Sequence, residues 1–329
     1  VCVGDVKLEV STGKIDLTNV KCKNFTPNVL LRQGKPFDFT YQSIAQYGSY
    51  GESVPQERME ARRAFSELKF GMFVHWGLYA SFAQGEWYLE QGGLDEAEYA
   101  KAANAFYPHA FDAREWVRAF KSAGAKYVVL TSKHHEGFAL FHSKVDSFNV
   151  VDATPFGRDV VAELAEACYK HNLKFGLYYS QDLDWAHPDG GGYLTGKTWC
   201  GDKAWWTNNW DYPDRSKKDF SICFEEKIKP QVKEILTGYG DLCLIWFDTP
   251  QTISAEQTDE LYRMVKTYQP ACLVNSRIGN GYGDYEFDGV VYDDLLGWVK
   301  AVVDSVTGLE FGDDDLGTMT LAEMAVYIF

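Results

Sequence analysis

The chain has 329 residues, of which 46% are hydrophobic, and 47 acidic against 32 basic residues give a formal net charge of −15. A surface with this excess of negative charge repels phosphate backbones and anionic lipid headgroups, which excludes nucleic acid as an expected partner. No apolar run reaches the roughly 20 residues that a membrane-spanning helix needs, so no membrane partner is expected.

The first 55 residues differ in pattern from the rest. Residues 6–10 alternate between apolar and polar side chains, and a second strand-like piece follows at residues 15–20. This pattern predicts a short β-rich appendage at residues 1–55, ahead of a main domain at residues 56–329. The chain begins at Val1 without a signal peptide, which fits a cytoplasmic protein as well as a secreted or periplasmic one whose leader is removed.

Five short apolar runs predict buried parallel strands, and polar clusters follow each of them directly. The runs are residues 70–74, 127–130, 173–177, 242–247 and 271–274. Amphipathic stretches of helical length precede or separate most of them, at residues 56–68, 95–105, 113–123, 159–171, 217–237 and 254–268. Asp112 is expected to cap one helix, and Ser254 with Gln257 to form a capping box on another. The alternation predicts an α/β protein with a (β/α)8-like, TIM-type barrel, whose functional residues gather at the carboxyl ends of the strands.

The pattern weakens after residue 280. One further strand at residues 289–292 and one helix at residues 294–306 are weak candidates, so fewer than eight strands are evident. We therefore expect an irregular or incomplete barrel with a divergent segment at about residues 288–329. Two long connections, residues 77–93 and 181–216, are expected to form the walls of the site.

Asp248 is the strongest candidate for a catalytic group. It directly follows the run at residues 242–247, so its carboxylate emerges at a strand end, while Ser254 already fits the cap of the next helix. Trp246, two residues earlier, is expected on the same side of the strand. Arg277 follows another apolar run, and it is either a structural ion-pair partner or the group that keeps a catalytic Asp ionised.

A nucleophilic carboxylate on a sugar-binding rim implies a second carboxyl group that acts as the acid. Glu286 is the best positioned, on the loop after Arg277, although the same residues also fit a Gly-rich turn with exposed charges. The 10 Trp and 20 Tyr residues suit the stacking faces of a sugar.

Three histidines follow predicted strands: His75, His134 and His135. They suit either the binding of hydroxyl groups or a metal site. Because His134 and His135 are adjacent, a strand would point them to opposite sides, and no HExxH spacing is present. Hydroxyl binding is therefore the favoured interpretation, and no metal or cofactor is expected.

Several of these segments, in order, resemble the signature segments of family 29 glycoside hydrolases, the α-L-fucosidases. The segments are residues 69–77, 85–88, 126–138, 175–180 and 245–248, and the resemblance spans about residues 56–286. It implies a retaining exo-enzyme that removes terminal α-L-fucose from fucosylated oligosaccharides or glycoconjugates.

By position, the resemblance implies that Asp248 is the nucleophile. It also implies a fucose-binding shell, made of His75, Glu86, Trp87, His134, His135, Tyr178, Trp246 and Arg277. The acid/base Glu of the family varies in position, so Glu286 is the first candidate and Glu310 the second. Two alternatives stay open: a fucose-binding barrel that has lost its acid, and a metal hydrolase that uses the three histidines.

Overall fold

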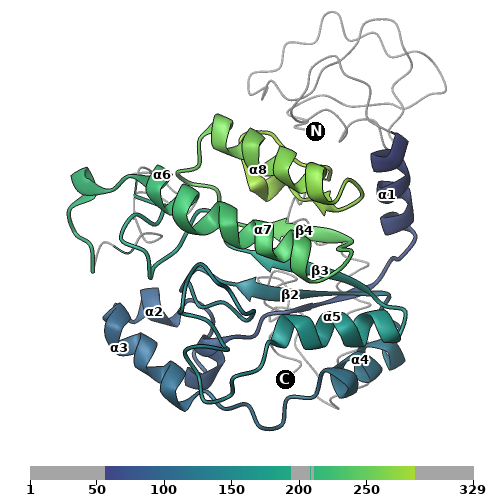
Figure 1. Cartoon of the computed structure of the whole chain (residues 1–329), viewed down its shortest axis with the longest axis horizontal. Coiled ribbons are helices and arrows are strands. Elements are labelled where there is room, and N and C mark those ends of the chain that lie inside the picture. Colours follow the sequence, from purple (N-terminus) through teal and green to yellow (C-terminus); the bar gives the residue numbers. More distant parts are fainter. Residues whose placement is uncertain (1–55, 194–207, 209–210, 286–329) are drawn as a thin grey trace, which may run out of the picture.

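The computed structural model describes residues 56–193, 208 and 211–285. Its centre is a parallel sheet of five strands in the order β1-β2-β3-β4-β5 (Figure 1). The strands are β1 (Gly71–Val74), β2 (Tyr127–Lys133), β3 (Lys174–Tyr179), β4 (Leu244–Phe247) and β5 (Leu273–Val274). Each of the five predicted apolar runs overlaps one of them, so these strands are confirmed, although β2 and β3 extend beyond the predicted ends to Lys133 and Tyr179.

Helices precede or separate the strands, and all but α2, which lies in the predicted connection at residues 77–93, overlap the predicted amphipathic stretches. They are α1 (Gln56–Ser66), α2 (Tyr88–Gln91), α3 (Glu96–Ala100), α4 (Ala113–Ser122), α5 (Val160–Lys170), α6 (Phe220–Cys223), α7 (Lys229–Gly238) and α8 (Ala255–Tyr268). The Asp112 side chain accepts the amides of Arg114 and Glu115 at the start of α4, and Ser254 forms a capping box with Gln257 on α8. Both predicted caps are confirmed.

The helix predicted at residues 217–237 begins later and is not uniform. It starts at Phe220, because Asp219 caps α6 through the amide of Ser221. A π-helical turn, Phe224–Ile228, joins α6 to α7 next to Pro230, whose nitrogen has no hydrogen to donate to the helical ladder. Within this turn Lys227 is buried, and it points into the protein.

The two faces of the sheet carry different sets of side chains, because successive side chains along a strand point to opposite faces. The main hydrophobic core lies between one face and the helices, with Leu130, Leu177 and Phe247 among its strand residues. A second, smaller cluster lies on the opposite face and includes Tyr178 and Leu244, with Phe73 and Trp246 packed against them. In Figure 1, α4, α5, α7 and α8 lie one after another alongside the strands, in the same order as in the chain. α2 and α3 lie at the side of the sheet away from α1.

Consecutive parallel strands with helices on one face are the arrangement of a (β/α) barrel, as predicted. The described strands form an open sheet, and one isolated parallel bridge between Asn275 and Tyr285 follows beyond β5, where a sixth strand is expected. The predicted appendage at residues 1–55 and the candidate elements at residues 289–306 lie outside the described residues.

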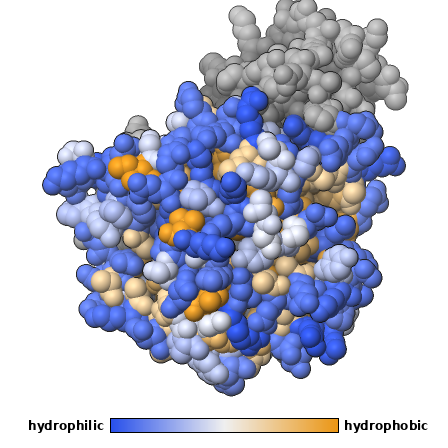
Figure 2. All heavy atoms as spheres, in the orientation of Figure 1, coloured by the Kyte–Doolittle hydropathy of each residue, from blue (hydrophilic) through white to orange (hydrophobic). Residues whose placement is uncertain are grey.

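The surface is mainly hydrophilic, with small separate apolar spots on the face seen in Figure 2. Among the described helices, none is long and apolar enough to cross a membrane. Cys168 and Cys272 are buried in the core, whereas Cys243 is only partly buried.

Candidate active site

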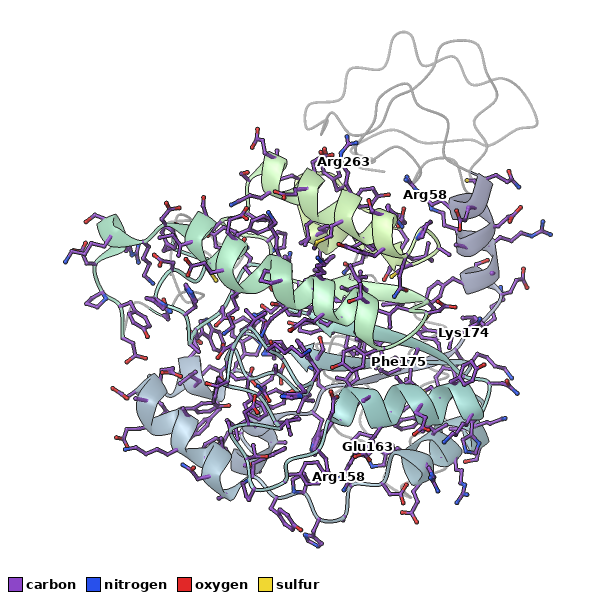
Figure 3. All side chains as sticks on the ribbon, in the orientation of Figure 1. Arg58, Arg158, Glu163, Lys174, Phe175 and Arg263 are labelled. Carbon is purple, nitrogen blue, oxygen red and sulfur yellow. The ribbon has the colours of Figure 1, made fainter. Side chains whose placement is uncertain are left out.

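The carboxylate of Asp248 stands at the carboxyl end of β4 and is held on both oxygens. The Tyr178 hydroxyl donates a hydrogen bond to Oδ2 at 3.0 Å, and the Arg277 guanidinium pairs with Oδ1. About 13% of the Asp248 side chain stays exposed, so a molecule from solvent can reach it. In Figure 3, Lys174 and Phe175 mark the amino end of β3, which is the end of the sheet away from this carboxylate. Arg277 is therefore the ion-pair partner of the candidate nucleophile itself.

Gln181 links Asp248 to Arg277 through their backbones. Its side-chain Oε1 accepts the amide of Asp248 at 2.7 Å, and its Nε2 donates to the carbonyl of Arg277 at 2.9 Å. The side chain is fully buried. The sequence analysis missed this residue, and a polar side chain directly after the β3 run was the only signal that could have found it.

Ser180 and Asp182, on either side of Gln181 in the chain, form hydrogen bonds to two further parts of the site. The Ser180 hydroxyl donates to the carbonyl of Leu183 at 2.6 Å and lies 2.7 Å from His135 Nδ1. Since its one hydrogen is used, Ser180 accepts from His135, which leaves the Nε2 of His135 as the acceptor in the neutral ring. Asp182 Oδ2 accepts three amides of the loop after β4, those of Gln251, Thr252 and Ile253.

The rings of His134 and His135 lie side by side, with centroids 4.1 Å apart. The expectation that they point to opposite sides is therefore wrong. The reason is local: the register of β2 shifts between Thr131 and Lys133, and the strand ends at Lys133, so strand alternation no longer applies. His135 Nε2 lies 3.7 Å from Asp248 Oδ2, which places both histidines beside the carboxylate.

Aromatic rings surround this group. Trp87 lies 5.0 Å from His135 and 5.4 Å from Trp185, and the Tyr178 ring stacks on His134 at 5.5 Å. Trp246 sits deeper, beside Tyr178 in register, and meets Phe73 edge-on at 5.2 Å. Trp185 was not singled out from the other Trp residues of its long loop, and only its contacts in the folded chain identify it.

Nine of the ten sequence-predicted site residues come together at this end of the sheet. They are His75, Glu86, Trp87, His134, His135, Tyr178, Trp246, Asp248 and Arg277. The tenth, Glu286, lies outside the described residues, as does Glu310. Among the described side chains, the group that could hold a metal ion is His75, Glu86 and His134, so Glu86 replaces the His135 of the metal-hydrolase alternative.

Several polar atoms of the site are shielded from solvent without a hydrogen-bond partner. Among the described residues these include His75 Nδ1, His134 Nδ1, His135 Nε2 and Glu136 Oε2. Buried polar atoms without a partner are rare in folded proteins and cost free energy. A ligand with several hydroxyl groups would satisfy them.

A buried ion network underlies the site. Asp184 accepts hydrogen bonds from Lys133 at 2.8 Å and from Lys227, which also pairs with Asp146. Burial alone would raise the pKa of Asp184, but the two ammonium groups outweigh it and hold that pKa below its usual range. Gly137, at φ 85°, passes so close that a Cβ there would lie 2.6 Å from Asp184 Oδ1. The backbone just after His134 and His135 therefore packs directly against the Asp184 carboxylate, and only a glycine leaves room for it.

Burial makes two of the imidazoles hard to protonate. It lowers the pKa of His75 to about 4 and the pKa of His135 well below its ordinary value, with His134 adding to both effects. In the unfolded chain a histidine titrates at about 6.5. Between these values the unfolded state binds protons that the folded state does not, so the stability contributed by neutral imidazoles is present above pH 6.5 and is lost as the pH falls.

We therefore expect the free energy of unfolding to fall by about 1.4 kcal/mol per pH unit for each such histidine between about pH 6 and pH 4.5. Thermal or urea unfolding across this range measures the slope. His135→Asn should flatten it, whereas His142→Asn, at a side chain that is 48% exposed, should keep it. Equal slopes in all three proteins would contradict the assignment.

Comparisons with known proteins agree with this geometry. A family model described as alpha-L-fucosidase matches residues 39–293. An alpha-L-fucosidase from Lactobacillus casei, AlfC, solved with the alpha-L-fucose product, is 49% identical, with a TM-score of 0.64 over 68% of this chain and 71% of that one. Alpha-L-fucosidase isoenzyme 1 from Paenibacillus thiaminolyticus is 35% identical, with a TM-score of 0.62 over 73% of this chain and 59% of that one.

Curated relatives match over shorter segments. The tissue alpha-L-fucosidase of Rattus norvegicus is 43% identical over 143 residues, which are 38% of this chain and 30% of that protein. The plasma alpha-L-fucosidase of Homo sapiens is 36% identical over 153 residues, which are 40% of this chain and 32% of that protein. The matched segments thus span about a third of the length of these curated relatives.

Proposed function

Because the chain belongs to the alpha-L-fucosidase family, we propose that it is a retaining exo-α-L-fucosidase acting on fucosylated oligosaccharides or glycoconjugates. The observation that carries the proposal is the Asp248 carboxylate, which is partly exposed at the end of β4 and held by Tyr178 and Arg277. A carboxylate fixed on both oxygens, beside imidazoles that each keep one ring nitrogen without a hydrogen-bond partner among the described residues, suits attack on a sugar carbon whose neighbouring hydroxyls are bound at the same time.

The reaction would proceed by double displacement. Asp248 attacks the anomeric carbon to form a fucosyl-enzyme, while a carboxylic acid protonates the leaving oxygen; the same group then activates the water that releases fucose. We assign the acid to Glu286, which follows directly on Tyr285, with Glu310 as the second candidate. Its position after the Asn275–Tyr285 bridge supports this assignment.

The imidazoles would bind the fucose hydroxyls, because each has a ring nitrogen without a hydrogen-bond partner among the described residues, and the Glu86 carboxylate beside His75 and His134 would accept from a further hydroxyl. The aromatic rings of Trp87 and Trp246 would face the apolar side of the sugar and its methyl group. Selection against L-galactose follows, since its extra hydroxyl on C6 would be buried without a hydrogen-bond partner.

The direct test is hydrolysis of 4-methylumbelliferyl α-L-fucoside, with the α-galactoside in parallel. We expect fluorescence from the fucoside and none above background from the galactoside. In the same assay Glu286→Gln should lose activity and Glu310→Gln should keep it; the reverse result would move the acid to Glu310. A folded protein that binds fucose but hydrolyses neither substrate would refute the enzyme and favour a fucose-binding barrel.

A further inference from the structure

We propose that His75, Glu86 and His134 form a binding site for Zn²⁺, and that the bound cation competes with the sugar. The competition with the sugar rests on the proposed function, whereas the zinc site itself does not. The cation is assigned as an inhibitor and takes no part in the double displacement, because it would occupy the lone pairs of the imidazole nitrogens and of the Glu86 carboxylate that accept hydrogen bonds from the sugar hydroxyls.

The three side chains offer ligand atoms at short mutual distances. One ligand atom from each lies within 4.8 Å of the other two. Zinc bonds of about 2.0–2.2 Å bring tetrahedral donors to roughly 3.4 Å from one another, so closure requires side-chain shifts of about 1 Å. Two imidazoles and one carboxylate, with a fourth position open, are a donor set that zinc accepts. The histidines follow β1 and β2, and Glu86 comes from the turn before α2.

The carboxylate of Glu136 lies next to His134. Its Nδ1 lies 3.6 Å from Glu136 Oε2, and both atoms are buried without a hydrogen-bond partner among the described residues. A metal-bound histidine commonly directs its other ring nitrogen to a carboxylate, which orients the ring and makes the bound nitrogen more basic. The Tyr178 ring, stacked on His134, holds the imidazole plane. Nε2 of His134 is thereby left as the metal ligand.

The charge around the group favours a dication. The carboxylates of Glu86, Glu136 and Asp248 lie near the imidazoles. Among the described cations beside them, the Arg277 guanidinium is paired with Asp248 and the Lys133 ammonium with Asp184, so the charges of Glu86 and Glu136 remain. Cations with strong affinity for imidazole, such as Zn²⁺, are expected to bind more tightly than Mg²⁺, which prefers oxygen ligands.

Isothermal titration of the protein with ZnCl₂ in chelator-free buffer, without sugar, tests the site itself. We expect one tight Zn²⁺ per chain and no comparable binding of MgCl₂. Glu86→Gln and His134→Asn should each weaken zinc binding at least about 10-fold, and Glu136→Gln about 10- to 100-fold. His142→Asn, at the exposed His142–Asp152 pair, is the matched control and should bind zinc as the wild type does.

The proposal is overturned if the wild type binds no Zn²⁺, or if Glu86→Gln and His134→Asn bind it with unchanged affinity. Circular dichroism checks that each variant is folded, and Glu86→Gln, at a partly exposed side chain of nearly equal volume, serves if His134→Asn does not fold.

Inhibition is measured separately. Zn²⁺ should raise KM for the fucoside without lowering kcat, and EDTA should reverse the effect; a fall in kcat at constant KM would refute competition. An inactive protein that still binds zinc would refute the proposed hydrolysis and leave the metal site standing, whereas an active protein without zinc binding would do the opposite.

Discussion

Asp248→Ala is expected to lower kcat for 4-methylumbelliferyl α-L-fucoside by at least about 10⁴-fold, because no fucosyl-enzyme can form without the carboxylate. Fucose binding should persist, since the imidazoles and Glu86 remain in place. Titration with fucose and fluorimetric assay of the same preparation measure the two effects. The alanine also removes the acceptor of Tyr178 and Arg277, so folding of the variant is checked by thermal unfolding.

Two controls separate a chemical role from a structural one. Asp214→Ala, at a side chain that is 48% exposed and paired with Lys217, should keep wild-type kcat. Azide added to Asp248→Ala should restore release of the aglycone, because this small anion can attack the anomeric carbon where the carboxylate stood, forming fucosyl azide as the aglycone leaves. A variant with near-normal kcat would mean that Asp248 is not the nucleophile.

Asp184→Ala should have the largest effect on stability, a loss of about 3–5 kcal/mol in the free energy of unfolding. The substitution leaves the Lys133 ammonium, whose side chain is fully buried, without its carboxylate, and removes one of the two carboxylates of Lys227. An uncompensated charge in such a place is far more costly than the loss of an exposed pair. Urea unfolding of the variant and the wild type measures the difference.

The matched control is Glu166→Ala, which breaks an exposed ion pair with Lys170 on α5 and should cost no more than about 1 kcal/mol. A double substitution, Lys133→Met with Asp184→Leu, should recover part of the lost stability, because it removes the unpaired charge along with its former partner. A loss below about 1 kcal/mol in Asp184→Ala would show that the network relaxes or admits water, and the argument from buried charge would fail.

The fold of the described residues could be predicted from local pattern because each strand overlaps a short apolar run and most helices are amphipathic stretches, several of them with a side-chain cap. Rim residues such as Asp248 follow from the same pattern, since polar side chains directly after a buried strand must emerge at its end. The local pattern therefore singled out Asp248, Arg277 and the histidines, whereas Glu86 and Trp87, which lie on a loop, were assigned to the group by the family resemblance.

Long-range pairings could not be predicted in this way. Gln181 and Asp248 are 67 positions apart, and Lys133 and Asp184 are 51 apart. Nothing local marks a buried Gln or Lys as a partner of one distant residue rather than another. The adjacent rings of His134 and His135 were missed for a different reason: a register shift at the end of β2 broke the alternation on which the expectation depended.

The strand order has a consequence for how the site is made during synthesis. Each described strand pairs with its predecessor in the chain, so no pairing has to wait for a distant later segment. Ribosomes deliver about 5–20 residues per second, so each strand becomes available only after the strand with which it pairs. The segments with the imidazoles and Tyr178 are therefore synthesised before Asp248, whereas the two hydrogen-bond partners of the Gln181 side chain, the Asp248 amide and the Arg277 carbonyl, come after it. Asp248 is thus synthesised after Tyr178, which donates to its carboxylate, and Arg277, which follows it in the chain, completes the ion pair.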